Sequence, residues 1–358
     1  MNALFGGAYS GRRVLVTGHT GFKGSWLCAW LELLGARVTG LALAPNTQPS
    51  HWELLGSAGV ASREQDIRDA AAVGRIILDS TPEVIFHLAA QPLVRRSYRD
   101  PLGTLSTNVT GLVNLFEAVR ASARPLVLIN ITTDKVYRPP VPDTGYAESD
   151  ALGGHDPYSA SKACAELISE SWRESYFQAQ GVALATARAG NVIGGGDWSA
   201  DRLVPDFIRA VCSGQSLRLR RPDAIRPWQH VLEPLSGYLA LGQALLASGP
   251  MAESWNFGPD PGQDLSVAEL AARICRAWPG ASVEADPGPH LHEAALLRLD
   301  SRKARERLGW RPVWDVDTTV SRTVDWYRDW HAGRGLNTRD DLEAYVVEAR
   351  RKGLAWAG

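Results

Sequence analysis

Tyr158 and Lys162 are the clearest candidates for chemistry in this chain. The preceding residues predict a helix start, with Asp156 as N-cap and Pro157 at the first helical position. Residues four apart share a helix face, so the Tyr158 hydroxyl and the Lys162 ammonium can act on one ligand. A nearby cation lowers a tyrosine pKa, which lets the phenolate take a proton from a hydroxyl as hydride leaves the same carbon. The alternative is an incidental surface pair.

A second group, Thr133, Asp134 and Lys135, follows an apolar run at residues 126–132. If that run is a strand, the group lies at the sheet edge where α/β proteins bind ligands. Elimination of water needs one group to protonate the departing hydroxyl and another to remove a carbon-bound proton. Asp134 and Lys135 suit these two tasks, with a solvated turn as the alternative.

The glycines of the segment Gly18, Gly21 and Gly24 predict a dinucleotide site, because they lie between an apolar run and a helical pattern. Bare backbone there allows close approach of a pyrophosphate, and the helix N-terminus offers free amides. The next apolar run ends without a carboxylate for an adenosine ribose and without an arginine for a 2′-phosphate, so NAD is modestly favoured over NADP.

Further along, Asp66 and Ile67 are placed to meet the adenine, and Ala89 and Ala90 would let the cofactor lie against the backbone. For Asp66, a solvated loop acid is an equal alternative.

An arginine cluster in the second half of the chain is a candidate diphosphate site, since guanidinium groups bind phosphate oxygens in pairs. Nucleic acid and a solvated face are the rival interpretations, but no comparable basic stripe occurs elsewhere. The cluster consists of Arg218, Arg220, Arg221 and Arg226.

The elements that position these residues follow a βα rhythm. Short apolar runs at 14–17, 38–43, 84–88, 126–132 and 182–187 alternate with helical patterns, as a parallel sheet covered on both faces requires. We therefore predict an α/β fold, a doubly wound parallel Rossmann sheet with a smaller, loop-rich α/β domain. The dinucleotide-binding domain is expected at 1–189, with returns around 224–258 and 316–332, and the smaller domain at 190–223, 259–315 and 333–358.

Composition agrees with a globular protein that handles small molecules. With 38 basic and 39 acidic residues, the net charge of −1 provides no field that would attract nucleic acid or an anionic membrane. The four cysteines have no zinc spacing, so we predict buried, reduced thiols and no metal site. Because no secretory leader or membrane-spanning run is evident, a cytoplasmic location is expected.

Taken together, these residues resemble the extended short-chain dehydrogenase/reductase family over residues 13–330. Within it, the resemblance is closest to the branch of CDP-glucose 4,6-dehydratases. The motifs that carry the resemblance are Gly18-His-Thr-Gly-Phe-Lys-Gly-Ser-Trp26, Ala89-Ala-Gln-Pro-Leu-Val-Arg95, Thr133-Asp-Lys135, Gly153-Gly-His-Asp-Pro-Tyr158, Ala189-Gly-Asn-Val-Ile-Gly-Gly-Gly-Asp-Trp198 and Arg226-Pro-Trp-Gln-His-Val231.

The resemblance implies a redox cycle on tightly held NAD, with a CDP-sugar as substrate and a homodimer or higher homo-oligomer as the assembly. Tyr158 would deprotonate the 4-hydroxyl, Lys162 would hold the ribose, and Thr133 would bind the C4 oxygen. Asp134 would protonate the departing 6-hydroxyl, with Lys135 as the candidate C5 base. The cofactor set adds Phe22, Lys23 and Gln91 to the residues above, and the substrate set is Arg95, Asn191, Arg202, Arg226 and His292.

The chain departs from related branches at two of these positions. Dehydratases of the dTDP branch carry Asp-Glu where this chain has Asp134-Lys135, and a lysine must lose its proton before it can act as a base. A serine is commoner in the CDP branch at Thr133, but either hydroxyl donates the same hydrogen bond.

Two other functions remain open from the sequence. A nucleotide-sugar 4-epimerase or oxidoreductase would use Tyr158 and Lys162 but not the elimination pair. A catalytically silent NAD-binding protein would bind the cofactor without turnover.

Overall fold

The structure is a computed structural model that describes residues 1–57, 59–247, 250–288 and 296–358. The substrate residue predicted at position 292 lies outside the described residues.

The centre of the molecule is a sheet of seven strands, all parallel, in the order β11-β6-β5-β4-β1-β2-β3. The five predicted strands are all present. The two that were not predicted lack a continuous apolar run: every residue of β3 is exposed, and polar and aromatic residues alternate along β11. The strands are β1 (Arg13–Thr17), β2 (Arg37–Ala42), β3 (Ala61–Glu64), β4 (Val84–His87), β5 (Leu126–Ile131), β6 (Val182–Ala189) and β11 (Ser254–Phe257).

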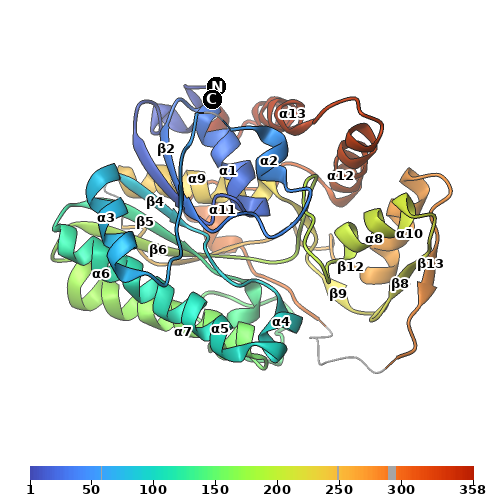
Figure 1. The fold of residues 1–358 in the computed structure, drawn as a ribbon, viewed down its shortest axis with the longest axis horizontal. Helices are drawn as coiled ribbons and strands as arrows, with labels where there is room; N and C mark the ends of the chain where they lie inside the picture. Colours follow the sequence, from blue (N-terminus) through green and yellow to red (C-terminus); the bar gives the residue numbers. More distant parts are fainter. Residues whose placement is uncertain (58, 248–249, 289–295) are drawn as a thin grey trace.

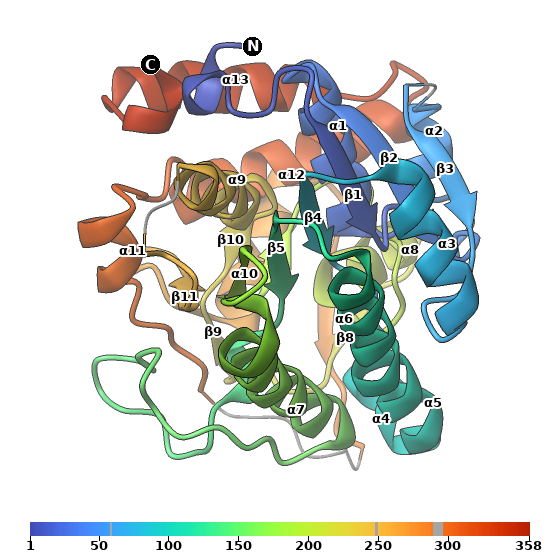
Figure 2. The same ribbon diagram turned by 90° about the vertical axis from the view of Figure 1, so that its left-hand side faces the viewer.

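Helices cover both faces of this sheet (Figure 2). Alternate strand residues face opposite layers: Leu15 joins the core beneath one set of helices, and Val14 and Val16 join the other. The prediction of a doubly wound Rossmann sheet is therefore confirmed. One layer contains α3 (Ala70–Ser80), α6 (Gly111–Ser122) and α7 (Pro157–Trp172), and the other contains α1 (Phe22–Leu33), α9 (Leu232–Leu246), α12 (Val316–His331) and α13 (Thr338–Arg351).

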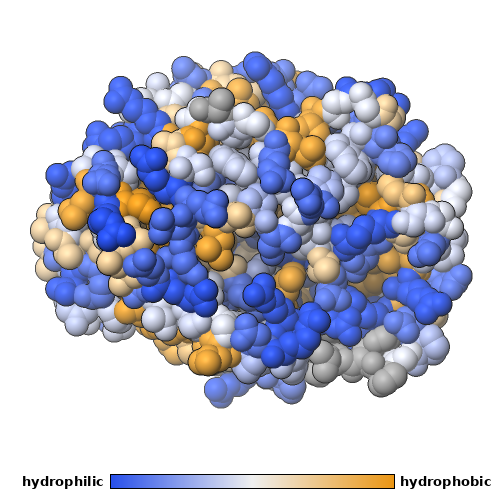
Figure 3. Space-filling model, in the orientation of Figure 1, coloured by the Kyte–Doolittle hydropathy of each residue, from blue (hydrophilic) through white to orange (hydrophobic). Residues whose placement is uncertain are grey.

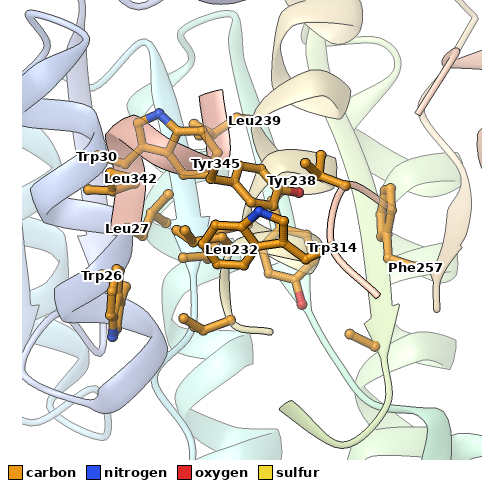
Figure 4. Packing of buried hydrophobic residues seen from close by; sticks show 14 of the residues in the cluster. Trp26, Leu27, Trp30, Leu232, Tyr238, Leu239, Phe257, Trp314, Leu342 and Tyr345 are labelled. Carbon is orange, nitrogen blue, oxygen red and sulfur yellow. The ribbon is translucent and has the colours of Figure 1, made fainter. Parts of the chain in front are cut away.

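Aromatic side chains fill the core between the sheet and the second helix layer (Figure 4). Trp30 of α1 meets the ring of Tyr345 of α13 edge to face at 5.8 Å, and Trp314 meets the same ring at 5.1 Å. Near the chain ends, Phe5 stacks on Trp356 at 4.9 Å. Because α13 packs on α1, we propose that residues 338–357 accompany the large domain and not the smaller one.

The smaller lobe lies beside the C-terminal ends of the strands, with α8 (Leu203–Cys212) and α10 (Val267–Ala277) next to short strands (Figure 1). The short strands pair as β7 (Val192–Ile193) with β10 (Gln229–His230), β8 (Leu217–Leu219) with β13 (Val283–Ala285), and β9 (Ile225–Arg226) with β12 (Leu265–Ser266). The remaining helices are α2 (His51–Leu55), α4 (Val94–Arg99), α5 (Pro101–Leu105) and α11 (Arg302–Arg307), and single turns cover Leu4–Gly7, Ser106–Thr110, Asp134–Val136, Arg173–Phe177 and Ala355–Ala357.

Surface features agree only in part with the sequence-based expectations. Hydrophobic residues lie in small separate groups on the face shown in Figure 3. No helix within the described residues has the length and apolar character needed to cross a bilayer. The expectation of buried thiols is confirmed for Cys28 but wrong for Cys212, which is exposed on α8.

Candidate active site

The glycine loop between β1 and α1 fits the backbone of a dinucleotide. Gly18 has a φ of +76°, and a Cβ there would lie 2.7 Å from the Ala89 nitrogen. At Gly24 a Cβ would lie 2.1 Å from the Gly18 carbonyl oxygen. Only glycine permits this close approach of loop, helix and neighbouring strand, and α1 then begins at Phe22 with its first amides free.

A cavity of about 1090 Å³ opens at the C-terminal edge of the sheet, beside this loop. It is lined by all the predicted cofactor residues, which are Gly18, Gly21, Phe22, Lys23, Gly24, Asp66, Ile67, Ala89, Ala90, Gln91, Tyr158 and Lys162. It is also lined by Thr133 and Lys135 and by four of the predicted substrate residues, Arg95, Asn191, Arg202 and Arg226. Asp134 is buried behind this lining.

Asp134 has one oxygen engaged and one available. The Thr133 hydroxyl donates to Oδ1 at 3.0 Å, and the Lys135 ammonium lies 3.6 Å from the same oxygen. The buried Oδ2 has no hydrogen-bond partner among the described residues. Gly190 lies beside this oxygen, where a Cβ would come within 3.1 Å of it. A buried carboxylate with an open acceptor suits proton exchange with a substrate hydroxyl, whose contacts in such sites often form only on binding.

Tyr158 and Lys162 project from the first turns of α7. Asp156 caps this helix by accepting from the Ser159 amide at 2.9 Å, and Pro157 is the first helical residue, as predicted. The Lys162 ammonium donates to the Ile131 carbonyl at 3.0 Å, which fixes it at the end of β5. Both side chains are buried.

Burial and neighbouring groups set the pKa of Tyr158. Burial raises the pKa of Tyr158 to about 12, while a hydrogen bond with Thr133 and the charge of Arg202 oppose that rise. Arg202 is thus a cation that lowers the pKa of this tyrosine. Burial also lowers the pKa of Lys162 to about 8.

Lys23, from the glycine loop, is a third lysine near these groups. Burial and repulsion by Arg202 lower the pKa of Lys23 to about 7, with attraction to Asp134 acting the other way. An excess of cations around a cavity favours an anionic ligand such as a diphosphate.

The arginine cluster also belongs to the cavity, because Arg218, Arg220, Arg221 and Arg226 all line it. Asp201, in a loop before α8, binds two cavity arginines at once. Its Oδ1 accepts from Arg95 at 2.9 Å and from Arg220 at 3.0 Å. This carboxylate joins α4 of the large domain to the segment after β8.

Two parts of this arrangement were missed by sequence reasoning. Asp201 lies 106 positions from Arg95, and nothing in their spacing predicts the contact. Glu166 is buried one helical turn beyond Lys162, and its position on the same helix face was a usable signal.

Asp66 and Asn191 also lie at the cavity. Asp66 is paired with Arg68 at 2.5 Å, and its contact with the adenine stays a prediction. The buried Oδ1 of Asn191 has no partner among the described residues.

The sheet, the glycine loop and the Tyr158–Lys162 pair are those of an extended short-chain dehydrogenase/reductase. The family model described as GDP-mannose 4,6 dehydratase matches residues 15–323, and the chain belongs to this family.

Known relatives give the same result. The chain is 46% identical over 336 residues to a CDP-glucose 4,6-dehydratase of Salmonella typhimurium, covering 92% of this chain and 94% of the relative. Among solved structures it resembles dTDP-glucose 4,6-dehydratase of Streptomyces venezuelae with NAD bound, at 25% identity and a TM-score of 0.75, covering 89% and 98% of the two chains. It also resembles UDP-glucose 4-epimerase of Thermus thermophilus in complex with NAD, at 27% identity and a TM-score of 0.76, covering 88% and 99%.

Proposed function

We propose that this chain is an NAD-dependent nucleotide-sugar 4,6-dehydratase that converts CDP-glucose to CDP-4-keto-6-deoxyglucose and water. The observation that carries the proposal is the Asp134–Lys135 pair at the end of β5, next to Thr133 and Tyr158. The 46% identity to a CDP-glucose 4,6-dehydratase supports the substrate, and the cavity beside the glycine loop supports NAD.

Each side chain then has a distinct task. When bound, NAD supplies a hydride acceptor and donor within one turnover. Tyr158 takes the proton of the 4-hydroxyl as C4 loses a hydride, and the Thr133 hydroxyl turns from Asp134 to donate a hydrogen bond to the oxygen that becomes the ketone. The ketone acidifies the C5 proton. The Lys135 ammonium gives its proton to the Asp134 carboxylate, 3.6 Å away, so that Lys135 can remove the C5 proton as Asp134 protonates the departing 6-hydroxyl. One water leaves, and the hydride lost from C4 and a proton are then added at C6 and C5.

The diphosphate of the substrate is assigned to the polar edge of the cavity. Asn191 and Arg226 would bind it, with Arg95 and Arg202 nearby. The role of His292 stays a prediction. Recognition of the cytosine base rests on the resemblance to the CDP-glucose enzyme, because no contact within the described residues identifies the base.

An epimerase has no use for Asp134 and Lys135, so the two reactions differ in solvent exchange. In deuterium oxide, a dehydratase product carries deuterium at C5 because the proton returned there comes from solvent. An epimerase product carries none, since hydride leaves and returns at C4 without passing through water. NMR spectroscopy of the product distinguishes the two results, and an unchanged substrate would favour a silent NAD-binding protein.

We propose that this enzyme is cytoplasmic, since a nucleotide-sugar substrate and free cysteines suit that compartment. A homodimer or higher homo-oligomer follows from the family resemblance, and light scattering measures it directly.

A further inference from the structure

Glu166 is a buried carboxylate that the proposed mechanism does not use. It lies on α7, one turn beyond Lys162, and is almost wholly screened from solvent. A charged group in this position needs several partners to offset the loss of water. Its partners therefore indicate what it holds in place.

These partners come from three adjacent strands. The Thr132 hydroxyl, directly after β5, donates to Oε1. On β6, Thr186 and Arg188 donate to Oε2 at 2.6 and 2.8 Å. Ser254, at the start of β11, is 3.4 Å from the same oxygen. One carboxylate thus joins α7 to the C-terminal halves of β5 and β6 and to β11.

The contact with Thr132 matters because the next residues are Thr133, Asp134 and Lys135. Lys162 itself binds the Ile131 carbonyl, the last residue of β5. Lys162 and Glu166 therefore hold two consecutive residues of the strand end from two consecutive turns of one helix. Their contacts set the register between the Tyr158–Lys162 helix and the loop that carries the elimination pair.

We propose that Glu166 is a positioning residue that holds its carboxylate one helical turn from Lys162 and aligns α7 with the Thr133–Lys135 loop. This inference rests on the proposed function for its effect on turnover. Burial alone would raise the pKa of Glu166, but Arg188 and the hydroxyls of Thr132 and Thr186 hold it below its ordinary value. The ionised carboxylate in turn opposes the lowering of the Lys162 pKa by burial.

Other titratable groups face Lys162 from neighbouring elements. His87, at the end of β4, is neutral because burial and the Lys162 charge lower its pKa to about 3. Lys23 from α1 repels Lys162, and its own pKa lies at about 7. Among the described residues, Glu166 is the group whose charge opposes the loss of the Lys162 proton.

The test compares pH profiles of turnover for E166Q, E166D and E170Q. Removal of the carboxylate charge is expected to move the basic limb of kcat to lower pH by about one unit. E166D retains the charge and should restore most of the wild-type profile. E170Q is the matched control, since it neutralises an exposed carboxylate one turn further along α7, and its profile should match the wild type.

An E166Q enzyme with reduced turnover and an unchanged basic limb would overturn the proposal, since Glu166 would then serve stability alone. If E166Q fails to fold because Arg188 is left unpaired, E166Q/R188Q removes both charges, and the same shift is expected. Calorimetric titration of NAD across the same pH range gives a second readout. If the wild-type enzyme leaves CDP-glucose unchanged, the proposed function is wrong. In that case, a difference between the wild type and E166Q in the pH dependence of NAD binding still tests the role of Glu166.

Discussion

The ammonium of Lys135 lies 3.6 Å from the fully buried carboxylate of its neighbour Asp134. The lysine side chain is partly exposed at the cavity, and the aspartate lies behind it. An acid and a base so arranged can transfer protons at adjacent carbons of one sugar, which oxidation of a hydroxyl alone does not require.

Replacement of either member of this pair is expected to stop elimination. D134N removes the proton donor and K135M the candidate base, and each should lower dehydration by about 10²-fold to 10⁴-fold. NAD affinity should stay unchanged, because neither residue belongs to the proposed cofactor set. Product formation followed by mass spectrometry tests this. D317N, at an exposed surface carboxylate, is the control. Turnover of D134N within twofold of the wild type would mean that Asp134 is not the acid.

Gly18 is expected to be essential for the cofactor. In G18A the new methyl group would lie 2.7 Å from the Ala89 nitrogen, so the loop must move away from its position. We expect NAD affinity to fall by about tenfold or more, measured by calorimetry. Gly262 also has a positive φ, of +85°, but nothing within 4 Å of an added Cβ, so G262A controls for backbone strain. Equal effects of the two variants on NAD affinity would contradict a specific role of the glycine loop in binding the cofactor.

Asp201 is expected to affect substrate binding more than chemistry. Without this carboxylate, the guanidinium groups of Arg95 and Arg220, which share one oxygen of Asp201, repel each other and move out of the positions in which they would meet the diphosphate. Since the three side chains are partly exposed, D201N should raise KM for the nucleotide sugar by about fivefold and leave kcat nearly unchanged. D260N removes an exposed pairing with Arg305 and serves as the comparison. A fall in kcat at constant KM would place Asp201 in the chemical step.

Glu233 should lower the stability of the protein as pH rises from mildly acidic to neutral, against the opposite effect of buried histidines such as His87. Burial raises the pKa of this carboxyl from 4.5 to about 7 in the folded protein. Between those values the folded chain holds a proton that the unfolded chain has released, so the contribution of Glu233 to the free energy of unfolding falls as pH rises and levels off above pH 7. The contribution is about 3 kcal/mol.

E233Q should remove this part of the pH dependence in urea titrations. Asp341 keeps a contribution of the same sign, since burial also raises its pKa to about 7, and buried histidines such as His87 keep contributions of the opposite sign. The slope of the free energy of unfolding with pH should therefore be more positive in E233Q than in the wild type, by up to about 1.4 kcal/mol per pH unit. A slope identical to that of the wild type would show that Glu233 is ionised in the folded protein at both ends of the range.

The parts of the fold that were predictable are those with a local pattern. Continuous apolar runs identified five strands, and the buried residues Val316, Val320, Val324 and Tyr327 of α12 recur at helical spacing. The strand β3 was not predicted because all its residues are exposed, so its sequence has no apolar run.

In the cavity too, the groups that were predictable are those whose members are close in sequence. Tyr158 with Lys162, and Thr133 with Asp134 and Lys135, are close in sequence, so spacing was enough to group them. The partners of Asp201 and Glu166 come from distant segments, and only the sheet order brings them together. The pKa of Tyr158 was also beyond sequence reasoning, because burial outweighs the effect of neighbouring charges.

Incubation of the purified protein and NAD with CDP-glucose, dTDP-glucose, GDP-mannose and UDP-glucose, each separately, tests the central claim most directly. Mass spectrometry of each nucleotide sugar should show the loss of one water from CDP-glucose alone. Loss of water from a different sugar would correct the substrate and keep the reaction. Unchanged masses for all four sugars, in protein shown to hold NAD, would contradict the assignment of a dehydratase.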